Sequence, residues 1–273
     1  MNKIYFCIAG AAFLLVSCTN NDEQKKSVPE TVTASNSPVI KYTIVARFAH
    51  DTTSFTEGLL VHKGQLFEST GHTDSYESSR SLFGIVDKSS GRITIKAEID
   101  KSKYFGEGIV FLKDKVYQLT DTTRIGFIYD TTNFKKTGEF HYEGDGWGLT
   151  TNGSHLIMSN GSSNIIYRDP TTFRTVKTLN VTDNNGPVSN INELEQINGF
   201  IYANQWLTDY ILKIDTSSGK VLGRLDLSPL KAAAKLAYPG AVETNGIAFD
   251  AAVDKIYVTG KLWPFIYEIK FTE

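Results

Sequence analysis

From about residue 39 onward, apolar and polar residues alternate in short runs rich in Tyr, Phe, Ile, Val and Thr. Gly, Asn, Asp and Ser separate these runs, and this alternation between turn-forming residues is typical of β-strands. The pattern also repeats, because five copies of one unit can be aligned along the chain. Their opening residues are Glu57-Gly58-Leu59, Glu107-Gly108-Ile109, Trp147-Gly148-Leu149, Asn192-Glu193-Leu194 and Asn245-Gly246-Ile247.

Each unit predicts a small sheet. A hairpin follows the opening residues, and its tip carries turn residues such as Asn152-Gly153 or Asn198-Gly199. A third strand comes next, an Asp-led turn ends it in most units, and a fourth strand follows. Four-stranded sheets at this period, arranged radially, form a β-propeller. The sequence therefore predicts an all-β, five-bladed β-propeller.

Two segments complete this prediction. The fifth unit stops just after its third strand, Phe265 to Ile269, whereas an unassigned strand, Val39 to Phe48, stands at the other end of the domain. We therefore expect the N-terminal strand to close the last blade. Residues 228–237 break the strand pattern with a Ser suited to an N-cap, then Pro and an Ala-rich body. They predict one short helix between blades four and five.

The N-terminus predicts export. Lys3 precedes an apolar run, residues 4–16, which has the length of a signal-peptide core and is too short to span a bilayer. It ends in Leu15-Val16-Ser17-Cys18, which resembles the lipobox of bacterial lipoproteins. The resemblance implies that residues 1–17 are removed and that Cys18 is lipidated. An ordinary signal peptide with an incidental Cys is the alternative.

Composition divides the rest of the chain into a tether and a folded domain. Residues 18–38 are polar and predict a flexible lipid-anchored tether, and residues 39–273 form the propeller domain. We expect it in the bacterial cell envelope, at the outer membrane, on the periplasmic or surface side. The only cysteines are Cys7 and Cys18, so the mature chain is expected to lack a disulfide. Charges nearly balance, with 28 Lys and Arg against 30 Asp and Glu, and the absence of a basic block argues against nucleic acid as a partner.

Candidate chemistry lies at one mouth of the central tunnel. The inner strand of each blade lines the axis of a propeller, so the residue at its start belongs to a ring. That ring is Glu57, Glu107, Trp147, Asn192 and Asn245. The second strand of each unit runs back to the same mouth, so the residues at its end form a second ring. That ring is Gly71, Asp121, Gly161, Trp206 and Lys261. Ordinary turns favour Gly, Asn and Asp but not Trp, Glu or Lys, so the rings predict a binding site.

These residues lie in motifs that resemble the plant-type glutaminyl cyclotransferase family. The motifs include Phe55-Thr56-Glu57-Gly58-Leu59, Phe105-Gly106-Glu107-Gly108-Ile109, Gly146-Trp147-Gly148-Leu149 and Thr259-Gly260-Lys261, and the resemblance covers roughly residues 40–271. It implies a five-bladed propeller that converts N-terminal Gln of a peptide or protein into pyroglutamate and releases ammonia. It also implies that no metal or other cofactor is needed. We expect a monomer.

The resemblance also assigns roles. Glu107 becomes the general acid/base, and Asn192 and Lys261 stabilise the oxyanion. Trp147, Trp206 and Phe105 form an aromatic substrate pocket, and Glu57, Asp121 and Asn245 complete the predicted substrate-binding set. The family usually has Gln at the position of Glu57 and Trp at that of Asp121. These departures remove one aromatic wall and add carboxylates, so substrate affinity or choice is expected to differ.

Two other functions fit the same residues. In a metal-dependent lactonase, Glu57, Glu107, Asp121 and Asn192 could cage Ca²⁺, which prefers oxygen ligands. Lys261 at the same mouth argues against that function, and loss of activity with a chelator would favour it. In a non-catalytic surface propeller, the mouth would bind a partner, and Glu107→Gln would keep the function.

Overall fold

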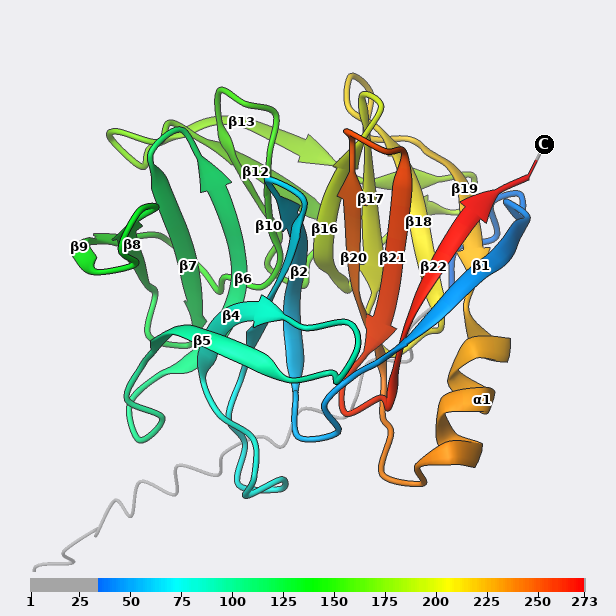
Figure 1. Cartoon of the computed structure of the whole chain (residues 1–273). Helices are drawn as coiled ribbons and strands as arrows, with labels where there is room; N and C mark the ends of the chain where they lie inside the picture. The colour runs from blue at the N-terminus through cyan, green and yellow to red at the C-terminus, as the bar shows by residue number, and fades with distance from the viewer. Residues whose placement is uncertain (1–33, 273) are drawn as a thin grey trace, which may run out of the picture. The chain divides into compact units, whose positions relative to one another are not determined.

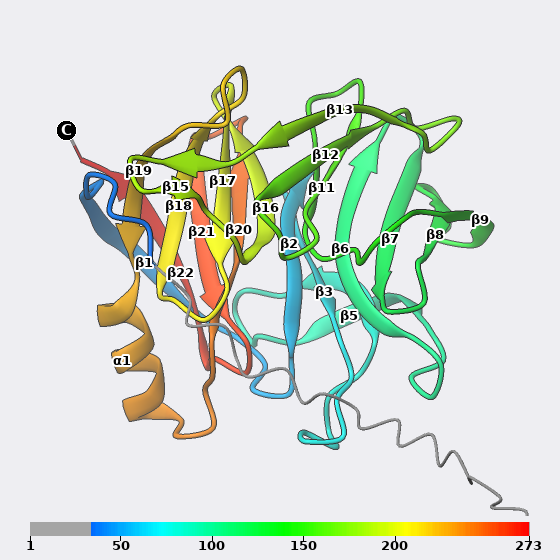
Figure 2. The same cartoon turned by 180° about the vertical axis from the view of Figure 1, so that it is seen from behind.

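Five four-stranded antiparallel sheets surround a central axis, and their inner strands stand side by side (Figure 1, Figure 2). The computed structural model describes residues 34–272. Blade one contains β2 (Thr56–His62), β3 (Gln65–Thr70), β4 (Leu82–Val86) and β5 (Ile93–Glu98). Blade two contains β6 (Phe105–Leu112), β7 (Lys115–Asp121), β8 (Ile125–Asp130) and β9 (Lys136–His141). The predicted all-β propeller with five blades is thus confirmed.

The next two blades follow the same order. Blade three contains β10 (Leu149–Thr151), β11 (Leu156–Met158), β12 (Asn164–Arg168) and β13 (Thr175–Asn180). Blade four contains β16 (Ile191–Ile197), β17 (Phe200–Gln205), β18 (Tyr210–Asp215) and β19 (Val221–Asp226). A small extra ribbon, β14 (Thr182–Asp183) and β15 (Gly186–Pro187), connects them.

The last blade joins both ends of the domain. It contains β20 (Thr244–Asp250), β21 (Lys255–Gly260), β22 (Phe265–Phe271) and, at its outer edge, β1 (Tyr42–Ala49). β1 pairs antiparallel with β22 from Tyr42 opposite Phe271 to Ala49 opposite Phe265. This pairing confirms that the N-terminal strand closes the propeller.

The N-terminal strand begins later than the sequence predicts. The backbone of Pro38 and Ile40 pairs with Arg224 of β19, because the Ile40 amide donates to the Arg224 carbonyl at 2.7 Å and the Arg224 amide donates to the Pro38 carbonyl at 2.8 Å. The chain therefore crosses the edge of blade four before it enters blade five. Residues 34–38, assigned to the tether, include the buried Ser35, whose hydroxyl donates to Asp183 at 3.0 Å.

The helix α1 (Ser228–Ala237) lies between blades four and five, as predicted. Its start differs from the prediction, because Leu227 is the N-cap and Ser228 is already helical. Asp226, the last residue of β19, accepts a hydrogen bond from the Ser228 amide at 2.9 Å. The carboxylate thus satisfies one of the amides at the start of the helix, and the N-cap position itself makes no side-chain hydrogen bond.

Apolar side chains fill the space between adjacent blades. In one cluster, Phe83 of blade one packs against Tyr129 of blade two with ring centroids 5.0 Å apart. The inner strands come closest at glycines, where a Cβ on Gly148 would lie 2.2 Å from the Asn192 carbonyl oxygen. This close approach brings the starts of the inner strands together, at the lower end of β2, β6 and β20 in Figure 1.

Candidate active site

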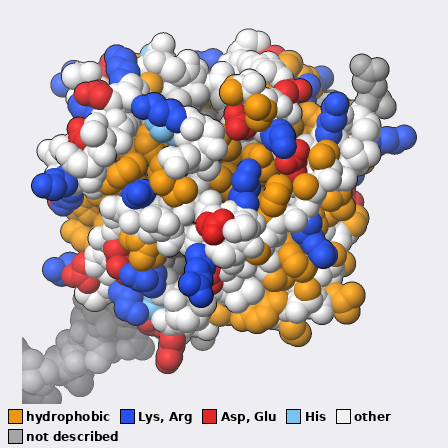
Figure 3. All heavy atoms as spheres, viewed as in Figure 1, with side chains coloured by type: hydrophobic (Ala, Val, Ile, Leu, Met, Phe, Trp, Pro, Cys, Tyr) orange, Lys and Arg blue, Asp and Glu red, His pale blue; other side chains and the backbone are white. Residues whose placement is uncertain are grey.

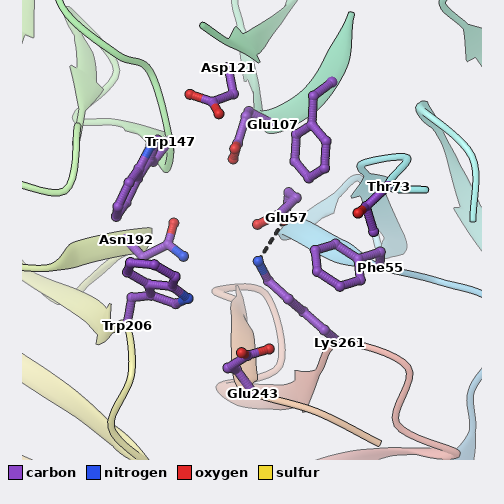
Figure 4. Close-up of a pocket in the computed structure, with 11 residues that line it drawn as sticks. Phe55, Glu57, Thr73, Glu107, Asp121, Trp147, Asn192, Trp206, Glu243 and Lys261 are labelled. Atoms are coloured by element: carbon purple, nitrogen blue, oxygen red, sulfur yellow. Dashed lines mark hydrogen bonds and ion pairs between the residues drawn. The ribbon is translucent and has the colours of Figure 1, made fainter. Parts of the chain in front are cut away.

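A cavity of about 300 Å³ opens at the end of the propeller where the inner strands begin. Figure 4 shows the side chains that converge on it from all five blades and from the loops between them. Its lining residues are Phe55, Glu57, Thr73, Phe105, Glu107, Asp121, Trp147, Asn192, Trp206, Glu243 and Lys261. Both predicted rings therefore contribute to one site.

Irregular strand pairing turns the first ring toward the axis. The register between the first two strands shifts near the start of β2, β6, β16 and β20. A bulge of this kind changes the direction of the side chains at its position. Glu57, Glu107 and Asn192 lie at such shifts and line the cavity. Asn245 lies at the fourth shift but is not among the cavity-lining residues.

The second ring contains two glycines that make room for aromatic rings. A Cβ on Gly71 would lie 2.2 Å from the ring of Phe105, and one on Gly161 would lie 2.4 Å from the indole of Trp147. A larger side chain at either position would displace the aromatic ring from the wall of the cavity. These glycines therefore serve the site through packing, in addition to the turn geometry considered from sequence.

A buried ion pair occupies one side of the cavity. The Lys261 ammonium lies 2.6 Å from Glu57 Oε1 and 4.5 Å from the centre of the Phe55 ring. The side chains of Lys261 and Glu57 are only 8% and 2% exposed. The side-chain amide of Asn245 donates to Glu57 Oε2 at 3.1 Å. Asn245, predicted to bind substrate, is not among the lining residues of the cavity, and its Oδ1 has no partner within residues 34–272.

Burial changes the proton affinity of this carboxylate. Loss of solvation raises the pKa of Glu57 to about 7, although the Lys261 charge and hydrogen bond oppose the rise. Glu57 is therefore a group that can change its charge near neutral pH.

Glu107 lies near this pair and is 5% exposed. Burial, followed by the charge of Glu57, raises the pKa of Glu107 well above its ordinary value. Its Oε2 has no hydrogen-bond partner among the described residues, and the same is true of Asn192 Oδ1. Buried polar atoms are normally paired. Both groups point into the cavity (Figure 4), so a ligand there could supply the missing partners.

The backbone holds these two groups in place. The Ser69 hydroxyl donates to the Glu107 carbonyl at 2.5 Å, and the Ser159 hydroxyl donates to the Asn192 carbonyl at 2.7 Å. In each case a residue in the second strand of one blade, or directly after it, holds the inner strand of the next blade. These two hydrogen bonds therefore fix the positions of Glu107 and Asn192 relative to the preceding blade.

Aromatic side chains form two opposite walls. Trp147 and Trp206 meet edge to face with ring centroids 5.4 Å apart, and Phe55 and Phe105 do so at 6.1 Å. In Figure 4 the tryptophans lie on the side of Asn192, whereas Phe55 lies beside Lys261. The space between the walls is apolar at its sides and polar at its centre, which suits a short side chain with a polar end.

The comparisons with known proteins agree with this geometry. The family model described as glutamine cyclotransferase matches residues 11–271. The chain belongs to the glutamine cyclotransferase family. It is 39% identical over 233 residues to a glutaminyl-peptide cyclotransferase of Arabidopsis thaliana, covering 84% of this chain and 71% of that protein. The crystal structure of Myxococcus xanthus glutaminyl cyclase superposes with a TM-score of 0.76 at 33% identity, covering 86% of this chain and 98% of that one.

Three lining residues of this family member were not predicted. Phe55 precedes β2, Thr73 lies in the loop between β3 and β4, and Glu243 directly precedes β20. Phe55 and Glu243 each stand two residues before a predicted ring member, so that spacing could have indicated them. Thr73 lies in a loop with no counterpart in the repeat, where its amide donates to the Ser79 hydroxyl at 3.0 Å.

The geometry gives little support to the metal-dependent alternative. Among residues 34–272, no group of three or more His, Cys, Asp or Glu side chains is placed to hold a metal ion. Glu57, one of the proposed ligands, is instead paired with Lys261. A second cation beside that ammonium would be repelled.

Proposed function

We propose that this protein is a glutaminyl-peptide cyclotransferase, an acyltransferase that converts the N-terminal Gln of peptides or proteins into pyroglutamate and releases ammonia. Membership of the family supports the activity. The observation that carries the proposal for this site is the buried Glu107 carboxyl, with a free oxygen facing a cavity that has aromatic walls. A group of this kind is suited to proton transfer.

The proposed reaction forms one bond and breaks another. The α-amine of the substrate attacks the carbonyl carbon of its own side-chain amide, so a C–N bond closes the five-membered ring. Glu107 takes a proton from the attacking nitrogen and gives it to the leaving nitrogen. The original C–N bond then breaks and ammonia departs. Because a free α-amine has a pKa near 8, a base with a raised pKa is well matched to this proton.

Asn192 and Lys261 are proposed to stabilise the negative charge that develops on the amide oxygen. Their side chains lie on either side of the space that Glu107 faces (Figure 4). An ammonium group has three donors, so the hydrogen bond from Lys261 to Glu57 leaves others for the substrate. Donors fixed before the reaction stabilise such a charge without rearrangement.

The aromatic walls are proposed to hold the substrate in its reactive shape. Cyclisation requires the extended side chain of Gln to fold back until its carbonyl carbon meets its own amine. Trp147 and Trp206 lie on one side of the cavity and Phe55, which packs against Phe105, lies on the other (Figure 4). The space between them is proposed to favour the folded form. Bringing two reacting groups together in this way lowers the entropic part of the barrier.

A three-part assay tests the proposed function. The protein is incubated with Gln-Ala-Ala amide, and ammonia and pyroglutamyl peptide are measured together. We expect equal amounts of both products, the same rate after treatment with a chelator, and no reaction of the Nα-acetylated peptide, whose nitrogen cannot attack. Loss of the reaction with chelator would favour the metal-dependent enzyme. No release from any Gln-initiated peptide would favour the binding propeller.

The pair of buried carboxyls predicts a pH effect for Glu57→Gln. The ionised Glu57 is one cause of the raised pKa of Glu107, so its removal lowers that pKa. Lys261, no longer paired with Glu57, acts in the same direction. Since Glu107 must be ionised to accept a proton, the acid limb of the kcat/KM profile is expected to move to lower pH. The pH dependence of kcat/KM for the wild type and for Glu57→Gln checks this. An acid limb at the same pH or at a higher pH in the variant would contradict it.

We also propose that the enzyme is a lipoprotein of the bacterial cell envelope, anchored through Cys18 after removal of residues 1–17. The resemblance to a lipobox supports this, and these residues lie outside the described part of the chain. Within residues 34–272, no helix is long and apolar enough to cross a membrane. Cell fractionation tests the anchor, because Cys18→Ser should leave the membrane fraction, and an unchanged distribution would count against lipidation.

A further inference from the structure

The opening of the cavity carries an excess of negative charge. Its lining contains one ammonium group and four carboxyl groups, namely Lys261 and Glu57, Glu107, Asp121 and Glu243. Because the pKa of Glu107 is raised and Glu57 is paired with Lys261, the excess charge is assigned to Asp121 and Glu243. Glu57 and Glu107 are buried. Asp121 and Glu243 are half-buried and lie on opposite sides of the cavity in Figure 4. We call these two residues the acidic rim.

The rim has no paired basic side chain within residues 34–272, although the charge of Lys261 acts on Asp121. Among the described residues, no salt bridge involves Asp121 or Glu243, whereas Lys261 is already paired with Glu57. Trp147 donates a side-chain hydrogen bond to Asp121, which leaves the charge in place. The exposed Asp145 lies close enough to add repulsion to Asp121. The field at the opening therefore favours a cation.

An independent feature points to a ligand inside the cavity that this rim surrounds. Asn192 is 4% exposed, its Oδ1 has no partner within residues 34–272, and its amide points into the cavity. Trp147 and Trp206 line the same cavity, with their rings edge to face. Aromatic faces attract cations as well as apolar groups, so the entrance offers two kinds of contact to a positively charged side chain.

We propose that the acidic rim selects substrates whose second residue is Lys or Arg. This inference rests on the proposed function, because it places the N-terminal Gln inside the cavity beside Glu107. The next Cα of the peptide lies only about 3.8 Å further along, so the second side chain leaves through the opening. A basic side chain there meets Asp121 and Glu243, whereas an acidic one meets like charge.

Three peptide amides that differ only at the second residue test the inference. They are Gln-Lys-Ala, Gln-Ala-Ala and Gln-Glu-Ala amide, and kcat/KM is measured for each at low ionic strength. We expect the order Lys, Ala, Glu, with about a tenfold difference between the first and the last for two charges near the rim. Added salt should reduce the difference, because such partly exposed charges are screened.

Charge-removing variants locate the effect. Asp121→Asn/Glu243→Gln should bring the Lys-to-Glu ratio of kcat/KM close to one. Asp114→Asn is the matched control, because this exposed carboxylate lies in the β6–β7 turn, at the far end of β6 from the cavity, and should leave the ratio unchanged. If the double variant does not fold, the salt dependence of the wild-type ratio provides the same test.

The outcomes are distinguishable. Equal kcat/KM for the three peptides, with ammonia released from each, overturns the selectivity and leaves the proposed function intact. A ratio that stays the same in the double variant, or that does not change with salt, overturns the assignment to the rim. No ammonia from any of the three peptides overturns the proposed function, and the inference falls with it.

Discussion

Glu107→Gln is expected to lower kcat for ammonia release about a thousandfold, within the range for losing a general acid/base. The amide has nearly the same shape as the carboxyl and can still form hydrogen bonds in the cavity. It cannot accept the proton of the attacking amine, and so cannot return it to the leaving nitrogen. KM should therefore change much less than kcat. Steady-state kinetics with Gln-Ala-Ala amide at the pH optimum measures both values.

Thermal unfolding provides the control for this variant. Burial disfavours the charged form of Glu107 and thereby raises its pKa well above the ordinary value. In the folded state the ionised carboxyl thus becomes more costly as the pH rises, and neutral Gln removes that cost. The variant should be at least as stable as the wild type at pH 8. An active Glu107→Gln protein would show that another group, with Glu57 as the first candidate, accepts the proton.

The repeat explains why so much of the fold could be predicted. Each unit has the same order of hairpin, third strand and fourth strand, so five units predict five blades. The missing fourth strand of the last unit then pointed to residues near the N-terminus. Equivalent positions in the units also predicted which residues start the inner strands. Eight of the nine residues predicted for catalysis or substrate binding line the cavity, and Asn245 is the exception.

The side-chain pairs within the site could not be predicted, because they join residues of different blades and the repeat describes each blade by itself. Asn245 lies at the start of the inner strand of blade five, as predicted, but its side-chain amide donates to the Thr56 carbonyl and to Glu57 Oε2 of blade one. The pairing of Lys261 with Glu57 joins the end of β21 to the start of β2, residues far apart in sequence. Sequence period predicts which residues share the mouth, but not which of them pair.

Lys261→Met is expected to lower the free energy of unfolding by about 3 kcal/mol at pH 8, as for the loss of one partner of a buried ion pair. The pair is short and nearly inaccessible to solvent. Without the ammonium, the Glu57 carboxylate must either take up a proton or remain buried as an anion, with Asn245 as its remaining side-chain partner within residues 34–272. Removing Lys261 also removes an effect that lowers the pKa of Glu57, so this pKa rises above about 7. Urea unfolding at pH 8 and pH 5.5 measures the loss.

The double variant Glu57→Gln/Lys261→Met separates charge pairing from packing. If the cost of Lys261→Met comes from an unpaired Glu57, removing both charges should recover most of the stability at pH 8. The sign of the pH effect follows from the same cause. The raised pKa makes ionised Glu57 costly at high pH, so the loss caused by Lys261→Met should shrink as the pH falls and Glu57 is protonated. An equal loss at both pH values, with no recovery in the double variant, would show that Lys261 contributes through packing against Phe55 rather than through its charge.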